Sequence, residues 1–231
     1  MITSVVVGGS GFLGRTIAEH FAQRGDTVLI TGRDKANAES IAATIGPDVQ
    51  GLAVDLSEPD AIEAAFSGVT QVDNLVITAS DPTPNSIDDF STAQAIRSIT
   101  VKLVGYAETV RVLRTRFTPA AAVVLFGGLA KERPYPGSTM VTTFNSGVSG
   151  LAKTLAREIA PHRVNVIHPG VVGDSPKWAS VPLERQPGAL RTPIGRLVTK
   201  SEIVNATDFL LTNGGVNAID LNVDGGFLIT T

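Results

Sequence analysis

Residues 5–14 read Val-Val-Val-Gly-Gly-Ser-Gly-Phe-Leu-Gly, and this stretch decides the fold. Three β-branched residues predict a buried strand, and glycines at positions 8, 11 and 14 follow it before a helical pattern begins. Glycine lets the backbone turn with φ > 0 and approach a ligand closely, and a helix start attracts phosphate through its unpaired N–H groups. Because strand, turn and amphipathic helix occur in this order, the stretch predicts a dinucleotide site. The expected contacts are Gly8, Ser10, Gly11, Phe12, Leu13 and Gly14.

Strand and helix patterns alternate along the rest of the chain. Strands are predicted over residues 2–7, 27–31, 49–55, 72–78, 120–126, 164–167 and 218–223. Helical patterns lie between them, the longest over 91–113 and 142–159, with a later one over 203–211. This alternation predicts a doubly wound, parallel α/β sheet with helices on both faces. Residues 173–196 hold four prolines and the only tryptophan, which predicts an irregular, lid-like segment.

Composition limits the class of protein. A chain of 231 residues with 43% hydrophobic and 18% charged residues can bury one substantial core, and we expect a single domain over 1–231. A net charge of −3 gives no basic footprint for nucleic acid, and without cysteine there is no disulfide or thiolate chemistry. We expect no metal, because His, Asp and Glu show no ligand spacing. No apolar run would span a membrane, and no signal peptide is evident, so a cytoplasmic location is expected.

Four further motifs resemble those of the short-chain dehydrogenase/reductase family. They are Val54-Asp55-Leu56, the run LAKTLA at 151–156, the run VNVIHPG at 164–170 and the run VDGG at 223–226. The resemblance covers nearly the whole chain, and it implies a seven-stranded Rossmann-type fold and an oxidoreductase that binds a pyridine nucleotide. It also implies cofactor contacts at Asp55 and Leu56 for adenine, at Ala79 for ribose, and at Pro169, Gly170 and Val172 for the carboxamide.

The positions that carry catalysis in the family hold other residues here. The family uses a serine after the fifth strand, a tyrosine and a lysine four apart on the next helix, and an asparagine on the central helix. The resemblance places these at Gly128, Val141, Asn145 and Lys102 respectively. Neither tyrosine of the chain has a lysine four positions later. Valine cannot donate a proton, so carbonyl reduction by the family's usual route is not expected.

Several polar residues are candidates for the missing chemistry. Lys102 could hold the nicotinamide ribose or stabilise developing negative charge, or it could extend along a helix at a subunit contact. His168 ends the sixth strand, where it could exchange protons or simply hydrogen-bond the backbone. Tyr135 could swing into the vacant tyrosine site. Lys177 and Trp178 are expected over a substrate pocket.

The end of the second strand favours NADP over NAD. Gly32 fills the place where an NAD site usually carries a carboxylate for the ribose 2′-OH. Arg33 follows it, and its planar guanidinium could bind a 2′-phosphate, or it could be an ordinary surface residue. NAD stays possible because Asp34 comes next, although its expected role is to cap a helix.

Three functions are compatible with these patterns. The first is an NADP-dependent oxidoreductase with a relocated proton donor. The second is a non-catalytic nucleotide-binding or regulatory protein, and the third is a non-redox cyclase, isomerase or lyase, because a fold alone does not specify chemistry. In each case we expect a small-molecule ligand. The resemblance implies a homodimer or homotetramer, formed through the helices over 91–113 and 142–159.

Overall fold

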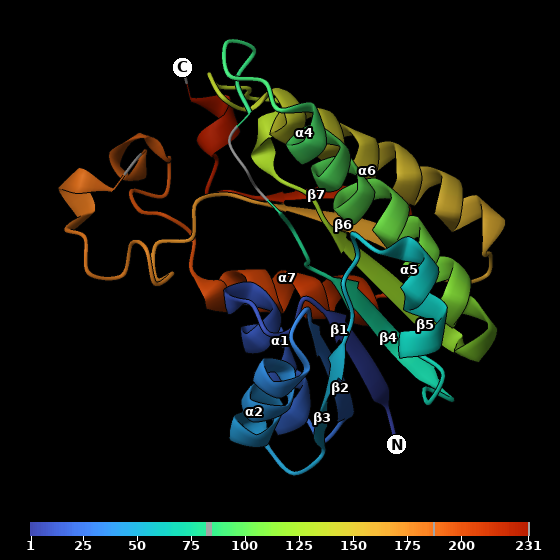
Figure 1. Ribbon diagram of the computed structural model, residues 1–231. Helices are drawn as coiled ribbons and strands as arrows, with labels where there is room; N and C mark the ends of the chain where they lie inside the picture. Colours follow the sequence, from blue (N-terminus) through green and yellow to red (C-terminus); the bar gives the residue numbers. More distant parts are fainter. Residues whose placement is uncertain (82–84, 187, 231) are drawn as a thin grey trace.

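The computed structural model describes residues 1–81, 85–186 and 188–230. A parallel seven-stranded sheet forms the centre, in the order β3-β2-β1-β4-β5-β6-β7 (Figure 1). The strands are β1 Thr3–Val7, β2 Thr27–Gly32, β3 Val49–Ala53, β4 Val72–Ile77, β5 Phe117–Phe126, β6 Arg163–Pro169 and β7 Asp220–Val223. Every strand pair is parallel, so the predicted doubly wound sheet is confirmed.

Helices cover both faces of the sheet. They are α1 Phe12–Gln23, α2 Lys35–Ile45, α3 Ile62–Ala65, α4 Thr92–Ile99, α5 Gly105–Leu113, α6 Thr139–Glu158 and α7 Lys200–Thr212. Figure 1 shows α4, α5 and α6 together on one face, and α1, α2 and α7 on the other. A sheet covered on both faces requires strands that are apolar on both sides, as Val5, Val6 and Val7 of β1 are.

The sheet divides the core into two layers, and the first strand contributes side chains to both. Val5 and Val7 belong to the cluster that contains residues of α5 and α6, whereas Val6 packs with Ile17 and Phe21 of α1. This division follows from the two-residue period of a strand, which sends alternate side chains to opposite faces. The strand is therefore fixed from both sides, and so is the turn that it delivers.

Most predicted elements differ from the structure by a few residues at one or both ends, and two of the differences have a visible structural basis. The strand predicted over 49–55 ends at Ala53, because the Asp55 carboxylate accepts hydrogen bonds from the Ser57 backbone and hydroxyl. The strand predicted over 218–223 begins at Asp220, because Ala218 has a φ of 58°, outside strand geometry. The helix predicted over 91–113 is continuous but contains a π-helical turn at Thr100–Val104, between α4 and α5.

The predicted irregular segment is irregular in the described residues. It contains two short 3₁₀ turns, Leu183–Arg185 and Ala189–Arg191, and Figure 1 shows it as the orange lobe beside the sheet. Within this lobe the ammonium of Lys177 lies 4.8 Å from the centre of the Trp178 ring. No helix among the described residues is long and apolar enough to cross a membrane.

Candidate active site

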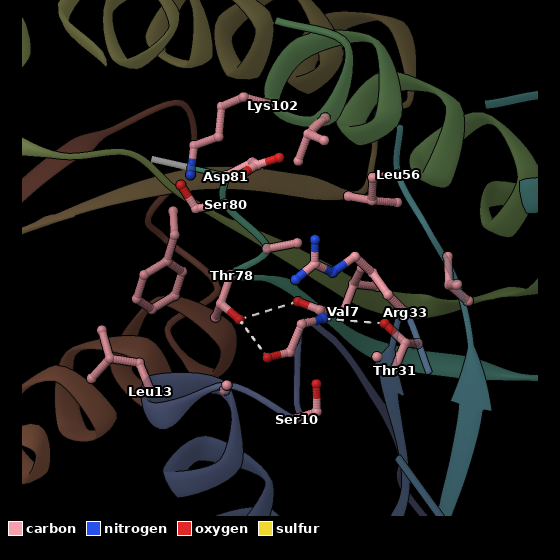
Figure 2. Close-up of a pocket in the computed structure, with 18 of the residues that line it drawn as sticks. Val7, Ser10, Leu13, Thr31, Arg33, Leu56, Thr78, Ser80, Asp81 and Lys102 are labelled. Atoms are coloured by element: carbon pink, nitrogen blue, oxygen red, sulfur yellow. Dashed lines mark hydrogen bonds between the residues drawn. The ribbon is translucent and has the colours of Figure 1, made fainter. Parts of the chain in front are cut away.

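The carboxyl ends of the central strands open into a cavity of about 490 Å³ (Figure 2). Most of the predicted contacts meet there: Gly8, Ser10, Gly11, Phe12, Leu13, Gly14, Arg33, Asp55, Leu56, Ala79, Lys102 and Pro169 line it. Two predicted contacts do not line it. The N–H of Gly170 donates to the carbonyl of Val223 at 2.9 Å, and the buried Val172 forms an isolated bridge with Val198. Lys177 and Trp178 do not line it either.

The glycine turn forms a concave stretch of backbone, the cradle, in which Gly8, Gly11 and Gly14 present no side chain to a ligand. Gly8 has a φ of 83°, and a Cβ on Gly14 would lie 2.3 Å from the Gly8 carbonyl oxygen. Helix α1 begins at Phe12, and its N-cap, Gly11, makes no side-chain capping bond. The first N–H groups of α1 are therefore left for a ligand. An exposed backbone and a helix start together fit a pyrophosphate.

Two threonines hold this turn in place. Figure 2 shows the Thr78 hydroxyl between the carbonyls of Val7 and Gly8, to which it lies at 3.1 and 3.3 Å. The N–H of Gly8 donates to the hydroxyl of Thr31 at 3.1 Å. The turn is thus fastened to both neighbouring strands, β2 and β4, before any ligand binds.

The end of β2 leaves little space for an acidic side chain at position 32. A Cβ on Gly32 would lie 2.6 Å from the Ser10 hydroxyl, so a longer side chain there would displace Ser10. Asp34 accepts from the N–H of Asn37 at 2.7 Å and caps α2, as predicted. Arg33 is exposed and lines the cavity, and no carboxylate of the described residues lies within 4 Å of it.

An arginine that the sequence patterns did not single out holds together the cavity wall that includes Asp55. Arg97 of α4 lines the cavity and donates to the Asp81 carboxylate and to the Ser57 hydroxyl, both at 2.7 Å. Burial raises the pKa of Asp55, but the bonds from Ser57 and the charge of Arg97 outweigh it and lower that pKa overall. Asp55 is therefore held ionised at the wall where the resemblance places adenine.

Lys102 enters the cavity from the π-helical turn. It is 3% exposed, and Figure 2 shows its side chain running down from the helix toward Ser80. Its Nζ donates to the Tyr106 hydroxyl at 2.9 Å, and that hydroxyl donates to the Ala79 carbonyl at 2.8 Å. No carboxylate of the described residues lies within 4 Å of it. Desolvation by burial accordingly lowers the pKa of Lys102 to about 7.

Comparison with known proteins identifies the family. A family model described as enoyl-(acyl carrier protein) reductase matches residues 10–228. The chain is a short-chain dehydrogenase/reductase. Carbonyl reductase family member 4 of Danio rerio is 26% identical over 231 residues, which cover 96% of each protein. The 3-oxoacyl-(acyl-carrier-protein) reductase FabG of Escherichia coli is 26% identical over 243 residues and 96% of each.

A solved structure supports the same family assignment. The short-chain dehydrogenase/reductase from Brucella melitensis, described as a glucose/ribitol dehydrogenase, is 25% identical and superposes with a TM-score of 0.90. The match covers 98% of this chain and 96% of that one. The chain therefore matches these relatives over nearly their full length and belongs among the family's oxidoreductases.

In this short-chain dehydrogenase/reductase, Gly128 and Asn145, the positions that the resemblance assigns to the family's serine and lysine, lie against each other. A Cβ on Gly128 would lie 2.8 Å from Nδ2 of Asn145, so a serine there would require the Asn145 amide to move. Asn145 is 4% exposed, and its Oδ1 has no hydrogen-bond partner among the described residues. Val141 packs beside Met140 and Phe144. None of these side chains can supply a proton at neutral pH.

Two other candidate proton donors, His168 and Tyr135, are not placed to transfer a proton in the cavity. His168 is fully buried, its Nδ1 accepts the N–H of Gly128 at 3.0 Å, and its Nε2 lies 2.9 Å from Asp220. Burial outweighs the bond to Asp220 and lowers the pKa of His168, so the ring is neutral and holds the backbone at Gly128. Tyr135 is 57% exposed and does not line the cavity.

Proposed function

We propose that this chain is an NADPH-dependent reductase of a carbonyl compound or imine in which Lys102 replaces the family tyrosine as proton donor. The observation that carries the proposal is the placement of the Lys102 amine. It is buried at the cavity wall, within hydrogen-bond distance of Tyr106 and without a carboxylate partner among the described residues. An amine in such a place is free to exchange a proton with a ligand.

The cavity fits a phosphorylated dinucleotide. The bare cradle of Gly8, Gly11 and Gly14 would hold the pyrophosphate, and Arg33 would bind the 2′-phosphate. The remaining contacts proposed are Ser10, Phe12, Leu13, Asp55, Leu56, Ala79 and Pro169, all of which line the cavity. When bound, NADPH supplies the hydride. The protein's own task is then to orient the acceptor and deliver a proton.

The pKa of Lys102 suits that task. With a pKa of about 7, roughly half of the amines carry the proton at neutral pH, and general acids work best when their pKa lies near the working pH. The ammonium can stabilise negative charge on an oxygen or nitrogen and then pass its proton to it. After transfer, the neutral amine keeps its hydrogen bond to Tyr106. Such a group contributes roughly 10²–10⁴-fold to rate.

Cofactor binding and turnover test the proposal separately. NADPH fluorescence is followed during titration, and a panel of aldehydes, ketones and imines is then screened by loss of NADPH absorbance. We expect binding below millimolar cofactor and turnover that falls at least 100-fold in Lys102→Met. Lys153→Met, which removes an exposed lysine of α6, serves as the control. Failure to bind NADPH, or turnover unchanged in Lys102→Met, would overturn the proposal.

A second candidate, a non-catalytic nucleotide-binding protein, is favoured by one observation. The residues at the positions that the resemblance assigns to the family's serine and lysine are Gly128 and Asn145, and the Asn145 amide lies where a side chain at position 128 would begin. Binding of NADPH with no turnover on any member of the panel would select this function over the reductase.

We also propose that the chain assembles as a homodimer or homotetramer. Residues of α5, α6 and the π-helical turn line a second groove of about 800 Å³, with Leu103, Val104, Leu151, Leu155 and Ile159 on its walls. Val104 is 47% exposed there, and burying such a surface against a second copy would be favourable. Light scattering tests this, and a strict monomer at all concentrations would contradict it.

A further inference from the structure

We propose that Lys102 is also a nucleophile, which captures small aldehydes and ketones as an imine when the cavity holds no cofactor. The product would be a covalent, reversible adduct between Nζ and the carbonyl carbon. This inference goes beyond reduction and does not depend on it. It needs only the amine, the cavity that it lines and the hydroxyl beside it.

The hydrogen bonds around Tyr106 leave the amine able to attack. A hydroxyl has a single proton, and that of Tyr106 is directed to the Ala79 carbonyl at 2.8 Å, with the Phe126 carbonyl at 3.3 Å. The Tyr106 oxygen must therefore accept from Lys102. A neutral amine has two protons and one lone pair, so one N–H is bound to Tyr106, and no group of the described residues donates to the lone pair.

The surroundings keep this amine neutral for much of the time. The faces of the Tyr106 and Phe144 rings, whose centres lie 4.9 and 6.0 Å from the Lys102 amine, attract the ammonium form, but desolvation by burial outweighs them and lowers the pKa. The nearby Asp81 carboxylate is held by Arg97. With a pKa of about 7, the uncharged fraction at neutral pH is roughly a half, against about one in 3,000 for a lysine at its ordinary 10.5. Only the uncharged amine is nucleophilic, and desolvation is a known way to activate lysine.

The chemistry balances without an oxidant or reductant. The nitrogen lone pair forms a bond to the carbonyl carbon while the carbonyl π electrons move to oxygen, which takes a proton. The carbinolamine then loses water as the C=N bond forms, so that one carbonyl and one primary amine give one imine and one water. Tyr106 is a positioning residue in this step, because its hydroxyl fixes Nζ at the cavity wall. Water reverses the reaction.

A trapping experiment tests the proposal on the whole, cofactor-free protein. The protein is incubated at pH 7.5 with benzaldehyde and sodium cyanoborohydride, which reduces an imine to a stable amine, and the modified lysines are located by peptide mass spectrometry. We expect Lys102 to be labelled at least tenfold faster than the exposed Lys35 and Lys153. Lys102→Met should lose this label, and Tyr106→Phe should slow it about threefold or more.

Circular dichroism and thermal melting establish that each variant is folded. Labelling confined to exposed lysines in the folded wild-type protein, with Lys102 unmodified, would overturn the inference. A rate at Lys102 no greater than at Lys153 would also overturn it. Because no NADPH is present, labelled Lys102 in a protein that never oxidises NADPH would support this inference and contradict the proposed reductase. NADPH turnover that depends on Lys102, in a protein whose Lys102 is not labelled, would support the proposed reductase and contradict this inference.

Discussion

The Nζ of Lys102 lies 2.9 Å from the hydroxyl of Tyr106, one helical turn further along the same helix. The family's catalytic pair consists of the same two residue types, in the opposite order and on the following helix. Here the lysine lines the cavity and the tyrosine is fully buried behind it. Burial raises the pKa of Tyr106 well above 10, so the tyrosine stays neutral and the lysine is the group that titrates.

Replacing Lys102 by methionine should stabilise the protein. Burial lowers the lysine pKa from 10.5 to about 7, so between these values the unfolded chain holds a proton that the folded chain lacks. Wild-type stability therefore rises with pH across this window and is lowest below pH 7. We expect Lys102→Met to gain up to about 4 kcal/mol at pH 7, with the gain shrinking toward pH 10. Urea unfolding at several pH values measures it, and a gain independent of pH would contradict the burial argument.

Adding a methyl group at Gly14 should close the cradle. The new Cβ would lie 2.3 Å from the Gly8 carbonyl oxygen, and such overpacking costs about 1–3 kcal/mol. We expect Gly14→Ala to lower the free energy of unfolding by that amount and to abolish NADPH binding. The control is Gly68→Ala, where a Cβ meets nothing within 4 Å and neither quantity should change. Normal NADPH affinity in Gly14→Ala would count against the cradle as the pyrophosphate site.

Arg33 should decide between the two nucleotides. If its guanidinium binds the 2′-phosphate, Arg33→Ala weakens NADPH binding by roughly 10–100-fold, as expected for a charge-assisted hydrogen bond, and leaves NADH binding unchanged. Lys35→Ala removes a neighbouring exposed charge that pairs with Glu39, and it controls for general electrostatics. Fluorescence titration with both cofactors measures the effect. Equal loss for NADPH and NADH would refute a 2′-phosphate contact.

Introducing a serine at position 128 should lower the free energy of unfolding of the otherwise unchanged protein. Its Cβ would lie 2.8 Å from the Asn145 amide nitrogen, so Gly128→Ser is expected to cost about 1–3 kcal/mol. Asn145→Ala removes the obstacle, and the double variant should be more stable than the sum of the two single changes predicts, by at least about 0.5 kcal/mol. Chemical denaturation of all four proteins gives this coupling. Strict additivity would show that the two positions do not obstruct each other.

Local signals made much of the fold and of the cofactor end predictable. The glycine turn, the strands beside it and the Asp34 cap each depend on residues a few positions apart, and the structure has all three. The pair Lys102 and Tyr106 also has a local signal, since residues four apart meet on a helix. A search for tyrosine followed by lysine does not find it, because the order is reversed.

Other parts of the site have no local signal. Arg97 gathers Ser57 and Asp81, which come from two separate connections and meet only in the folded sheet. The contact between Gly128 and Asn145 likewise joins the end of β5 to the middle of α6. The break in the long central helix is a further case, because the apolar spacing of 91–113 fits an uninterrupted helix and gives no sign of the turn at Thr100–Val104.

The carbonyl of Ala79, just after β4, is connected to Lys102 by two hydrogen bonds. It accepts from Tyr106, and Tyr106 in turn anchors the amine of Lys102, so a single hydroxyl connects the tip of β4 to the titrating nitrogen. A ligand that displaced the backbone at Ala79 would therefore also disturb the hydroxyl that holds the Lys102 amine. The geometry of the connection after β4 is in this way a determinant of where the amine sits.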